Sequence, residues 1–329
     1  MRGVEGMSET IRLMRATPVA TLALMLAACA TKTIAPRGDI LIDGKSVHPE
    51  SVTSTADGAL FTGSMSGTIY RAAPGGSVAR PFIVPNAENG LRSVFGVLAD
   101  GRSGRLWVCS VPNSFAPRVA GAPPPAPSEV AAFALDSGRL IGRWPFPAPG
   151  GTCNDIAIAR DGSAYASDTP GGRILKLPRG GKALEVVVSD ERLKGIDGLD
   201  FGADGALYWN NVQKNELWRL VLPTAGRPAQ FTQLKVSEKM GGPDGLRHIG
   251  GNRFLQAEGT SGRATLVTVK RDEARIQVLR DGLNSSPGIT LIGNTVYVVE
   301  GKIQYLFNPE LRGKDPGPFK AIAIALPRR

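Results

Sequence analysis

Asp204-Gly205-Ala206-Leu207-Tyr208 is one of six similar segments in this chain of 329 residues. Each consists of a small turn followed by a short apolar run that carries an aromatic residue. The other five begin at Asp57, Gly104, Asp161, Gly250 and Gly293. The aromatic residues lie at positions 61, 107, 165, 208, 254 and 297, so the segments recur at intervals of 43 to 46 residues, with one interval of 58. A regular repeat of this length indicates an array of similar structural units.

The spacing and composition of the repeat predict an all-β fold. Further strand-like runs, such as residues 172–177 and 216–220, follow the aromatic segments, and no amphipathic helix stands out. Four short strands in 43 to 46 residues are typical of a propeller blade. We therefore expect a six-bladed β-propeller with four-stranded blades. Residues 38–42 and 319–325 are expected to share one blade and close the ring, which removes exposed edge strands. A two-sheet sandwich would not explain the repeat.

The one long interval has a visible cause. Residues 112–127 are rich in proline, which cannot join a strand ladder, so they are predicted to be an insertion within the second blade. Propeller topology would place this insertion on the rim beside the start of the first strands.

The N-terminal region is typical of an exported protein. Arg12 and Arg15 precede an apolar stretch, residues 18–28, that is too short to span a bilayer. The stretch ends in Leu26-Ala27-Ala28-Cys29, which resembles the lipobox of bacterial lipoproteins. We therefore predict a signal peptide over residues 1–28, a lipidated Cys29 with a short tether over 29–37, and one propeller domain over 38–329. The protein would be a membrane lipoprotein that faces the periplasm; an ordinary cleaved signal is the alternative.

Composition argues against several other classes of function. The net charge is +10, but the basic residues are scattered and no basic-aromatic platform is visible, so nucleic acid is not expected as a partner. No GxSxG motif and no zinc-type Cys/His spacing is present. Cys109 and Cys153 could form a disulfide in an oxidising compartment, but the sequence alone leaves this open, as it does the oligomeric state.

Positions eleven residues before each aromatic residue form a second pattern. They are Glu50, Gly96, Asn154, Asp197, Pro243 and Ser286; allowing a turn one residue shorter in the fifth repeat replaces Pro243 by Asp244. Each would begin the innermost strand of its blade, so the side chains should meet at one mouth of the central channel. Individually, Asp or Asn before Gly is ordinary turn chemistry. Together, Glu50, Asn154, Asp197 and Asp244 predict an oxygen-ligand site for one divalent cation, which we expect to be calcium.

The same residues carry a resemblance to a known family. Pro49-Glu50-Ser51, Cys153-Asn154-Asp155, the run 195–200 and Pro243-Asp244-Gly245-Leu246 are similar to motifs of the senescence marker protein/gluconolactonase (regucalcin-like) family of six-bladed calcium propellers. The resemblance covers residues 45 to 310. It implies that Glu50, Asp197 and Asp244 bind the metal directly and that Asn154 binds metal or substrate. This chain departs from the family in having Asp at position 197, where Asn is usual, and Thr152 where an Arg holds the sugar-acid substrate.

These observations predict a calcium-dependent hydrolase of an ester-like bond in a small-molecule substrate, above all a lactone. Asp244 or Asp197 would act as the general base, and Asn154 would contact substrate. The alternative is a non-catalytic, lipid-anchored periplasmic propeller that binds a ligand or a protein. A third possibility, a strictosidine-synthase-like propeller, would not need four ligating residues.

Overall fold

The computed structural model describes residues 38–112 and 126–327. The predicted signal peptide, Cys29 and residues 113–125 of the proline-rich insertion lie outside the described residues. Within the compact unit Thr33–Arg329, the described chain is almost entirely β-structure. Its two short helical segments are η1 (Glu191–Leu193) and α1 (Gln304–Phe307). None of the helices in the described ranges is both long enough and apolar enough to cross a bilayer.

Strand pairing in the described residues gives five sheets: one of eight strands, one of five and three of four. The eight-stranded sheet is joined at the parallel β1–β5 pairing, so the strands are described here as blades 1 to 6, with this sheet divided into blades 1 and 6. Blade 1 contains β2 (Pro49–Ser54), β3 (Leu60–Ser64), β4 (Ile69–Ala72) and β5 (Val78–Ile83). Blade 2 contains β6 (Ser93–Asp100), β7 (Arg105–Val111), β8 (Glu129–Ala134) and β9 (Leu140–Pro145). Blade 3 contains β10 (Cys153–Ile158), β11 (Ala164–Asp168), β12 (Arg173–Leu177) and β13 (Glu185–Ser189).

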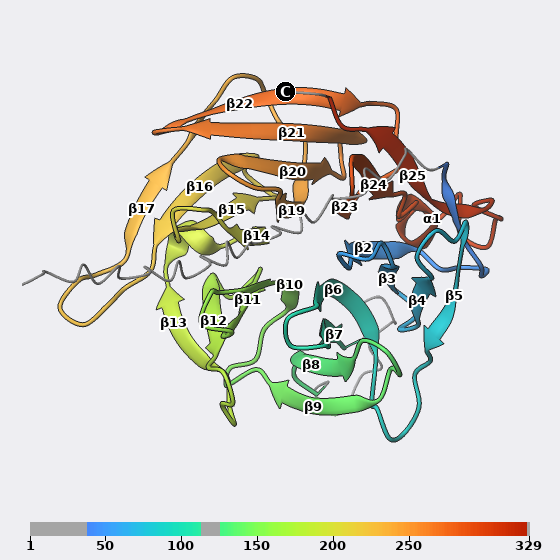
Figure 1. Cartoon of the computed structure of the whole chain (residues 1–329), viewed down its shortest axis with the longest axis horizontal. Helices are drawn as coiled ribbons and strands as arrows, with labels where there is room; N and C mark the ends of the chain where they lie inside the picture. The colour runs from blue at the N-terminus through green and yellow to red at the C-terminus, as the bar shows by residue number, and fades with distance from the viewer. Residues whose placement is uncertain (1–37, 113–125, 328–329) are drawn as a thin grey trace, which may run out of the picture. The chain divides into compact units, whose positions relative to one another are not determined.

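The second half of the chain repeats the arrangement. Blade 4 contains β14 (Ile196–Phe201), β15 (Leu207–Asn211), β16 (Glu216–Val221) and β17 (Gln230–Gln233). Blade 5 contains β19 (Pro243–His248), β20 (Arg253–Glu258), β21 (Arg263–Lys270) and β22 (Glu273–Arg280), and the short β18 (Lys235–Val236) pairs with β22. Blade 6 contains β23 (Ile289–Ile292), β24 (Thr295–Val299), β25 (Phe319–Ala325) and β1 (Ile40–Ile42). The first strand of each blade lies nearest the common centre (Figure 1).

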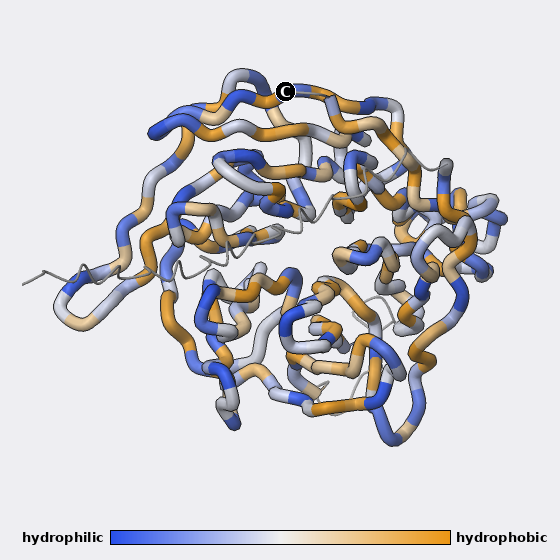
Figure 2. Tube along the Cα trace, in the orientation of Figure 1, coloured by the Kyte–Doolittle hydropathy of each residue, from blue (hydrophilic) through white to orange (hydrophobic). Residues whose placement is uncertain are grey.

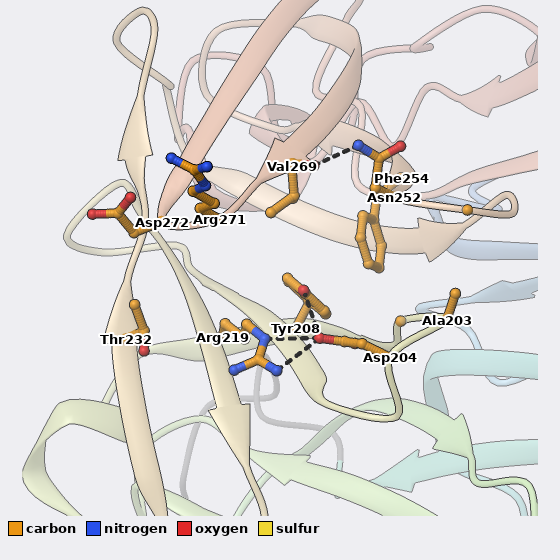
Figure 3. A pocket seen from close by; sticks show the side chains of 12 residues that line it. Ala203, Asp204, Tyr208, Arg219, Thr232, Asn252, Phe254, Val269, Arg271 and Asp272 are labelled. Atoms are coloured by element: carbon orange, nitrogen blue, oxygen red, sulfur yellow. Dashed lines mark hydrogen bonds and ion pairs between the residues drawn. The ribbon is translucent and has the colours of Figure 1, made fainter.

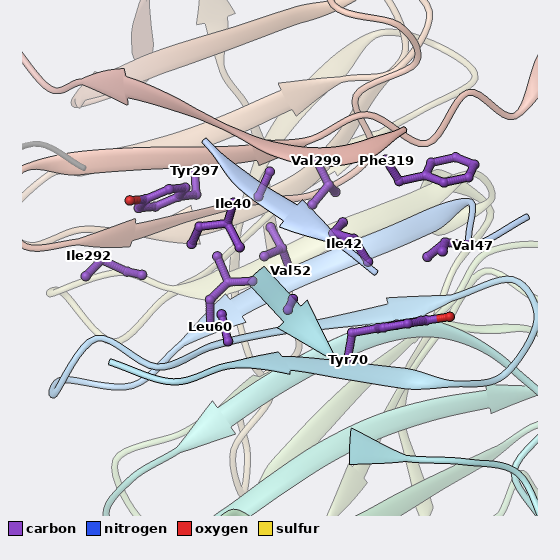
Figure 4. Packing of buried hydrophobic residues seen from close by; sticks show 13 residues of the cluster. Ile40, Ile42, Val47, Val52, Leu60, Tyr70, Ile292, Tyr297, Val299 and Phe319 are labelled. Carbon is purple, nitrogen blue, oxygen red and sulfur yellow. The ribbon is translucent and has the colours of Figure 1, made fainter. Parts of the chain in front are cut away.

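The two ends of the propeller domain share blade 6, as the sequence predicted. Ile40 lies opposite Ala321 and Ile42 opposite Phe319 in an antiparallel ladder. The same strand, β1, also pairs in parallel with β5 of blade 1, which links the first and last blades. Ile40, Ile42, Val52, Leu60 and Phe319 pack together across this junction (Figure 4). The N-terminal strand thus closes the ring with both hydrogen bonds and apolar contacts.

Burial changes systematically from the inner to the outer strands. The inner strand β3 is buried at every position, because neighbouring blades pack on both of its faces. The outer strand β9 alternates between partly buried and exposed residues, as expected for a sheet edge with one covered face. Hydrophobic residues accordingly follow the strands, while hydrophilic residues gather in the connecting segments (Figure 2). The all-β propeller predicted from the repeat is confirmed.

The structure also settles the pairing of two cysteines. Cys109 of β7 and Cys153 of β10 form a disulfide that joins blades 2 and 3. Both cysteines are fully buried, and Cys153 immediately precedes Asn154 at the start of its strand. The bond therefore fixes one predicted site residue to the neighbouring blade.

Removing this disulfide should destabilise the protein strongly. The bridge spans 44 residues, and closing a loop of that length in the unfolded chain contributes roughly 3–4 kcal/mol to stability in the chain-entropy model. Urea unfolding of the Cys109→Ala/Cys153→Ala variant, and of the reduced wild type, should show losses of this size. Reductant should not change the stability of the double variant. A reduced wild type with an unchanged unfolding midpoint would contradict the expectation.

Candidate metal centre at the propeller axis

The predicted ligands lie in irregularities of the innermost strands. In β14, Ile196 pairs with Asn211 and Leu199 pairs with Trp209, which leaves Asp197 and Gly198 as two residues opposite one. The same shift occurs in β10 between Cys153 and Ile156 and in β19 between Pro243 and Leu246. In β2, a register shift between Pro49 and Ser51 leaves Glu50 outside the regular pairing with β3. Such bulges twist a strand and redirect the side chains in them, so the predicted ligands come from residues that the regular ladder leaves out.

Strand register confirms one positional assignment and corrects two others. Pro243 pairs with Glu258 as Ile196 pairs with Asn211, so Asp244 is the equivalent of Asp197. In blade 2 the hairpin is one residue longer than in blade 3, so the equivalent position is Phe95 and not Gly96. In blade 6 it is one residue shorter, and the equivalent is Pro287 and not Ser286. Constant spacing from the aromatic residue fails in blades 2 and 6 because the hairpin length changes. In blade 5 the hairpin is as long as in blade 4, so the turn is not shorter as expected; instead Phe254 lies at the position of Leu207, one residue earlier than Tyr208.

The four predicted side chains line one small cavity at the axis. Glu50, Asn154, Asp197 and Asp244 surround a space of about 10 Å³, the scale of a single water molecule or ion. Glu50, Asn154 and Asp197 are each exposed by 8% or less, whereas Asp244 is less completely buried. The Nδ2 atom of Asn154 donates hydrogen bonds to Asp197 Oδ2 at 3.0 Å and to Thr169 Oγ1 at 3.1 Å. Since these bonds occupy the amide nitrogen, Oδ1 is the Asn154 atom left to bind a cation.

Burial and mutual repulsion raise the pKa values of the three acids in this cluster. Burial raises the pKa of Glu50 well above its ordinary range, and the nearby Asp197 carboxylate raises it further. Burial, followed by the charges of Asp197 and Glu50, also raises the pKa of Asp244 well above its usual value. The pKa of Asp197 rises to about 7, again chiefly through burial, although hydrogen bonds from Asp244 and Asn154 oppose the shift. A cluster of acids this close needs a counter-charge before all its members can ionise.

A buried ion pair that the sequence analysis missed lies beside the cluster. Arg247 of β19 donates to both carboxylate oxygens of Asp155, with Nη1–Oδ2 at 2.6 Å and Nη2–Oδ1 at 2.7 Å. Burial alone would lower the pKa of Arg247, but the Asp155 carboxylate outweighs it and the pKa is raised. Asp155 follows Asn154 directly and Arg247 lies three residues after Asp244, so both were visible as charged residues within predicted inner strands.

Buried polar residues of the second strands hold the bulges in place. Ser167 Oγ accepts a hydrogen bond from Asp155 N and donates one to Asp197 O, both at 2.9 Å. Asn210 Oδ1 accepts from Gly198 N at 3.0 Å, and its Nδ2 donates to Asp244 O at 2.6 Å. Ser167 and Asn210 are fully buried, and each lies two residues after the aromatic residue of its repeat. A polar residue recurring at a buried position was the signal that could have found them.

The donor set fits a hard divalent cation. Three carboxylates and an amide oxygen are the ligand types that calcium prefers, and their net charge of −3 would fall to about −1 on binding. Among residues 38–112 and 126–327, no group of three Asp, Glu, His or Cys side chains is already arranged to hold one metal ion. The carboxyls instead bond to one another, as Asp244 does to Asp197. Binding would therefore require these carboxyls to lose protons and turn toward the ion.

Two roomier cavities lie at the opposite ends of the first strands. One, of about 590 Å³, lies between blades 4 and 5 and includes Asp204, Tyr208, Arg219 and Arg271 in its wall (Figure 3). There Arg219 pairs with Asp204 at 2.8 Å, and the Tyr208 hydroxyl donates to the same carboxylate. The other, of about 640 Å³, lies between blades 3 and 4. Neither contains any of the four predicted ligands.

Comparisons with known proteins agree with the fold. Residues 39–72 match the model of the strictosidine synthase-like family, N-terminal region, and no curated protein matches the chain by sequence. Among solved structures, a protein assigned as a gluconolactonase is 17% identical, with a TM-score of 0.62 over 89% of this chain and 96% of that one. The luciferin-regenerating enzyme is 13% identical, with a TM-score of 0.60 over 89% and 94%. A virginiamycin B lyase from Staphylococcus aureus is 15% identical, with a TM-score of 0.58 over 87% and 83%.

The chain is a β-propeller. At these identities the structural likeness establishes the fold alone, because one propeller scaffold supports many chemistries. The strictosidine synthase-like match spans β1 to β4 and includes Glu50. It therefore covers one predicted ligand and none of the other three.

The raised pKa values predict that the metal-free protein becomes less stable as the pH rises. A carboxyl whose pKa is about 7 when folded and about 4 when unfolded binds more protons in the folded state, so its contribution to stability is lost as pH rises from about 4 to 7. With chelator present, the free energy of unfolding should fall between pH 5 and pH 8. The isosteric Asp244→Asn variant should show a shallower fall. Identical slopes for the two proteins would show that the cluster does not titrate in this way.

Proposed function

We propose that this propeller belongs with the gluconolactonase-like calcium enzymes and hydrolyses an ester-like bond in a small molecule, above all a lactone. The observation that supports this most is the convergence of Glu50, Asn154, Asp197 and Asp244 on one ion-sized cavity at the axis. Four side chains from four blades supply only oxygen donors there. The structural likeness to a protein assigned as a gluconolactonase is consistent with such a site.

Each residue has a role in the proposed chemistry. When bound, the cation would supply Lewis-acid polarisation of a substrate carbonyl oxygen. Asp244 is better placed than Asp197 to act as the general base, because it is less buried and Asp197 already accepts a hydrogen bond from Asn154. Its carboxylate would take a proton from the attacking water and return it to the alkoxide released when the acyl C–O bond breaks. Asn154 Oδ1 would bind the cation, and Asn154 would also contact substrate if its Nδ2 exchanged the hydrogen bond to Thr169 for one to the bound molecule.

The substrate is not expected to be gluconolactone itself. Thr152 occupies the position at which the resembling family has a sugar-acid-binding Arg, and its backbone N–H donates to Asp168 at 3.0 Å. A threonine cannot provide the paired, charged donors of a guanidinium. We therefore favour a less polar lactone or an aryl ester.

A non-catalytic binding propeller is the second candidate. The cavity beside the cluster has room for about one ion, and the two larger cavities lie away from it. In that case the cation would shape a docking surface for a ligand or protein. Neither candidate involves nucleic acid.

One set of measurements separates the two candidates. Calorimetric titration of metal-free wild type with calcium should give one site, and Glu50→Gln or Asp244→Asn should weaken it by at least about tenfold. Asp204→Asn, which alters an aspartate of the cavity in Figure 3, is the control and should leave affinity unchanged. A panel of lactones and aryl esters should show calcium-dependent hydrolysis that Asp244→Asn abolishes. Calcium binding without hydrolysis would favour the non-catalytic binding propeller. A protein that binds no calcium would reject both the hydrolase and the binding propeller as proposed here.

We also propose that the protein is exported and anchored to the membrane through Cys29. The buried disulfide is consistent with an oxidising compartment.

Strand directions indicate where the tether would join the propeller. The first strand of each blade begins at the face that carries the cluster. Because β23, β24, β25 and β1 are antiparallel in turn, β1 runs toward that face. Gly38, which precedes β1, therefore lies toward the opposite face, and the proposed tether would join the propeller there.

The anchor can be tested on the full-length chain. Cys29→Ser should prevent lipid attachment, because the thiol is the acceptor in the lipobox that Leu26-Ala27-Ala28-Cys29 resembles. Cell fractionation should then find the variant in the soluble periplasmic fraction, or retained only by its uncleaved signal. Cys109→Ser, which alters a cysteine of the propeller, should remain membrane-bound. An unmodified Cys29 in the mass spectrum of the mature wild type would contradict the proposal.

A further inference from the structure

The guanidinium of Arg247 crosses the central channel beside the acidic cluster. Arg247 belongs to blade 5, yet it contacts Asp155 of blade 3 and the carbonyl oxygen of Val97 in blade 2. Its side chain and that of Asp155 are only 9% and 5% exposed. One positive charge thus links three blades in the interior of the ring.

Both Nη atoms of this guanidinium face oxygen atoms, whereas its Nε is buried with no hydrogen-bond partner among the described residues. Besides the two Asp155 oxygens at 2.6 and 2.7 Å, Nη1 donates to Leu246 O at 2.8 Å and Nη2 to Val97 O at 3.4 Å. A carboxylate with both oxygens engaged and two backbone carbonyls are also ligands that a calcium ion uses. The guanidinium therefore occupies an environment that would suit a divalent cation.

The neighbouring charges make a cation necessary at this point. Asp155 follows Asn154 in the chain, and its charge acts on Glu50, Asp197 and Asp244. Asp155 cannot turn away, because its carboxylate also accepts hydrogen bonds from Ile156 N and Leu199 N at 2.9 and 3.1 Å. Without Arg247, a fixed buried carboxylate would stand beside three more acids with no counter-charge, which destabilises the folded state.

We propose that Arg247 fills a second cation position in the channel, so that the protein binds a single divalent cation, at the Glu50–Asn154–Asp197–Asp244 cluster. The proposal rests on the proposed function for the cluster itself. Arg247 is thus a positioning and specificity residue: it supplies a permanent charge, holds Asp155, and limits the number of ions that the channel accepts.

Counting bound ions tests this inference. Native mass spectrometry and calorimetric titration with calcium should give one ion for the wild type. Arg247→Met, which keeps the length and removes the charge, should bind two ions. Asp155→Asn/Arg247→Met, which removes both charges, should return to one. Arg219→Met is the matched control: it breaks the ion pair with Asp204 outside the channel and should leave the count at one.

The melting temperature supplies an independent readout. Arg247→Met should melt well below wild type in chelator and recover most of the difference in millimolar calcium, because an ion bound only to the folded state stabilises it. The double variant should show a calcium response equal to that of the wild type. A merely structural role for the ion pair would lower the melting temperature of Arg247→Met equally with and without calcium.

The outcomes separate this inference from the proposed function. A wild type that binds no calcium would reject the cluster as a metal centre, whatever the variants do. A folded Arg247→Met that binds the same number of ions as wild type would overturn the second cation position. If Arg247→Met and Arg247→Gln both fail to fold in millimolar calcium, the proposal is also overturned, because the vacated position should then accept the ion.

Discussion

The first strands of neighbouring blades meet backbone to backbone around the axis, and this close approach constrains the rest of the site. A Cβ atom on Gly198 would lie 2.2 Å from Asp244 O, and one on Gly96 would lie 2.4 Å from Asn154 O. Such contacts are impossible, so only glycine fits at these two positions. In blade 4, Asp197 adjacent to Gly198 lines the axial cavity together with Asp244 of the neighbouring blade, so the close approach of the two backbones brings these acids within reach of one another.

This convergence creates an electrostatic conflict that the fold resolves in part. Glu50, Asp197 and Asp244 are held by backbone geometry, so they cannot relax apart as surface carboxylates would. Arg247 is committed to Asp155 by two short hydrogen bonds and cannot neutralise all of them. The raised pKa values of the cluster express the remaining imbalance. A divalent cation is the simplest group that would remove it.

Ring closure supplies the rigidity that such a site needs. The β1–β25 ladder and the β1–β5 pairing tie blade 6 to blade 1, and the Cys109–Cys153 disulfide ties blade 2 to blade 3. Neither link contacts the cavity, but both limit how far the blades can move apart. Preorganised ligands lose less conformational entropy when an ion or substrate binds, so these links would favour affinity at the axis.

Much of the fold followed from the sequence, because local physics produced the signal. The recurring turn and aromatic residue of each repeat reflect one hairpin per blade, and the apolar ends, residues 38–42 and 319–325, were the strand-like runs that the six repeats left over. Glu50, Asn154, Asp197 and Asp244 could be chosen because they share a register relative to that hairpin.

Tertiary structure alone decided the other features of the site. Hairpin length put Phe95 and Pro287, rather than Gly96 and Ser286, in register with the four predicted ligands. The Asp155–Arg247 pair joins residues 92 positions apart, which no local pattern records. The partners of a buried charge depend on which blades face each other across the channel, and that is a property of the closed ring.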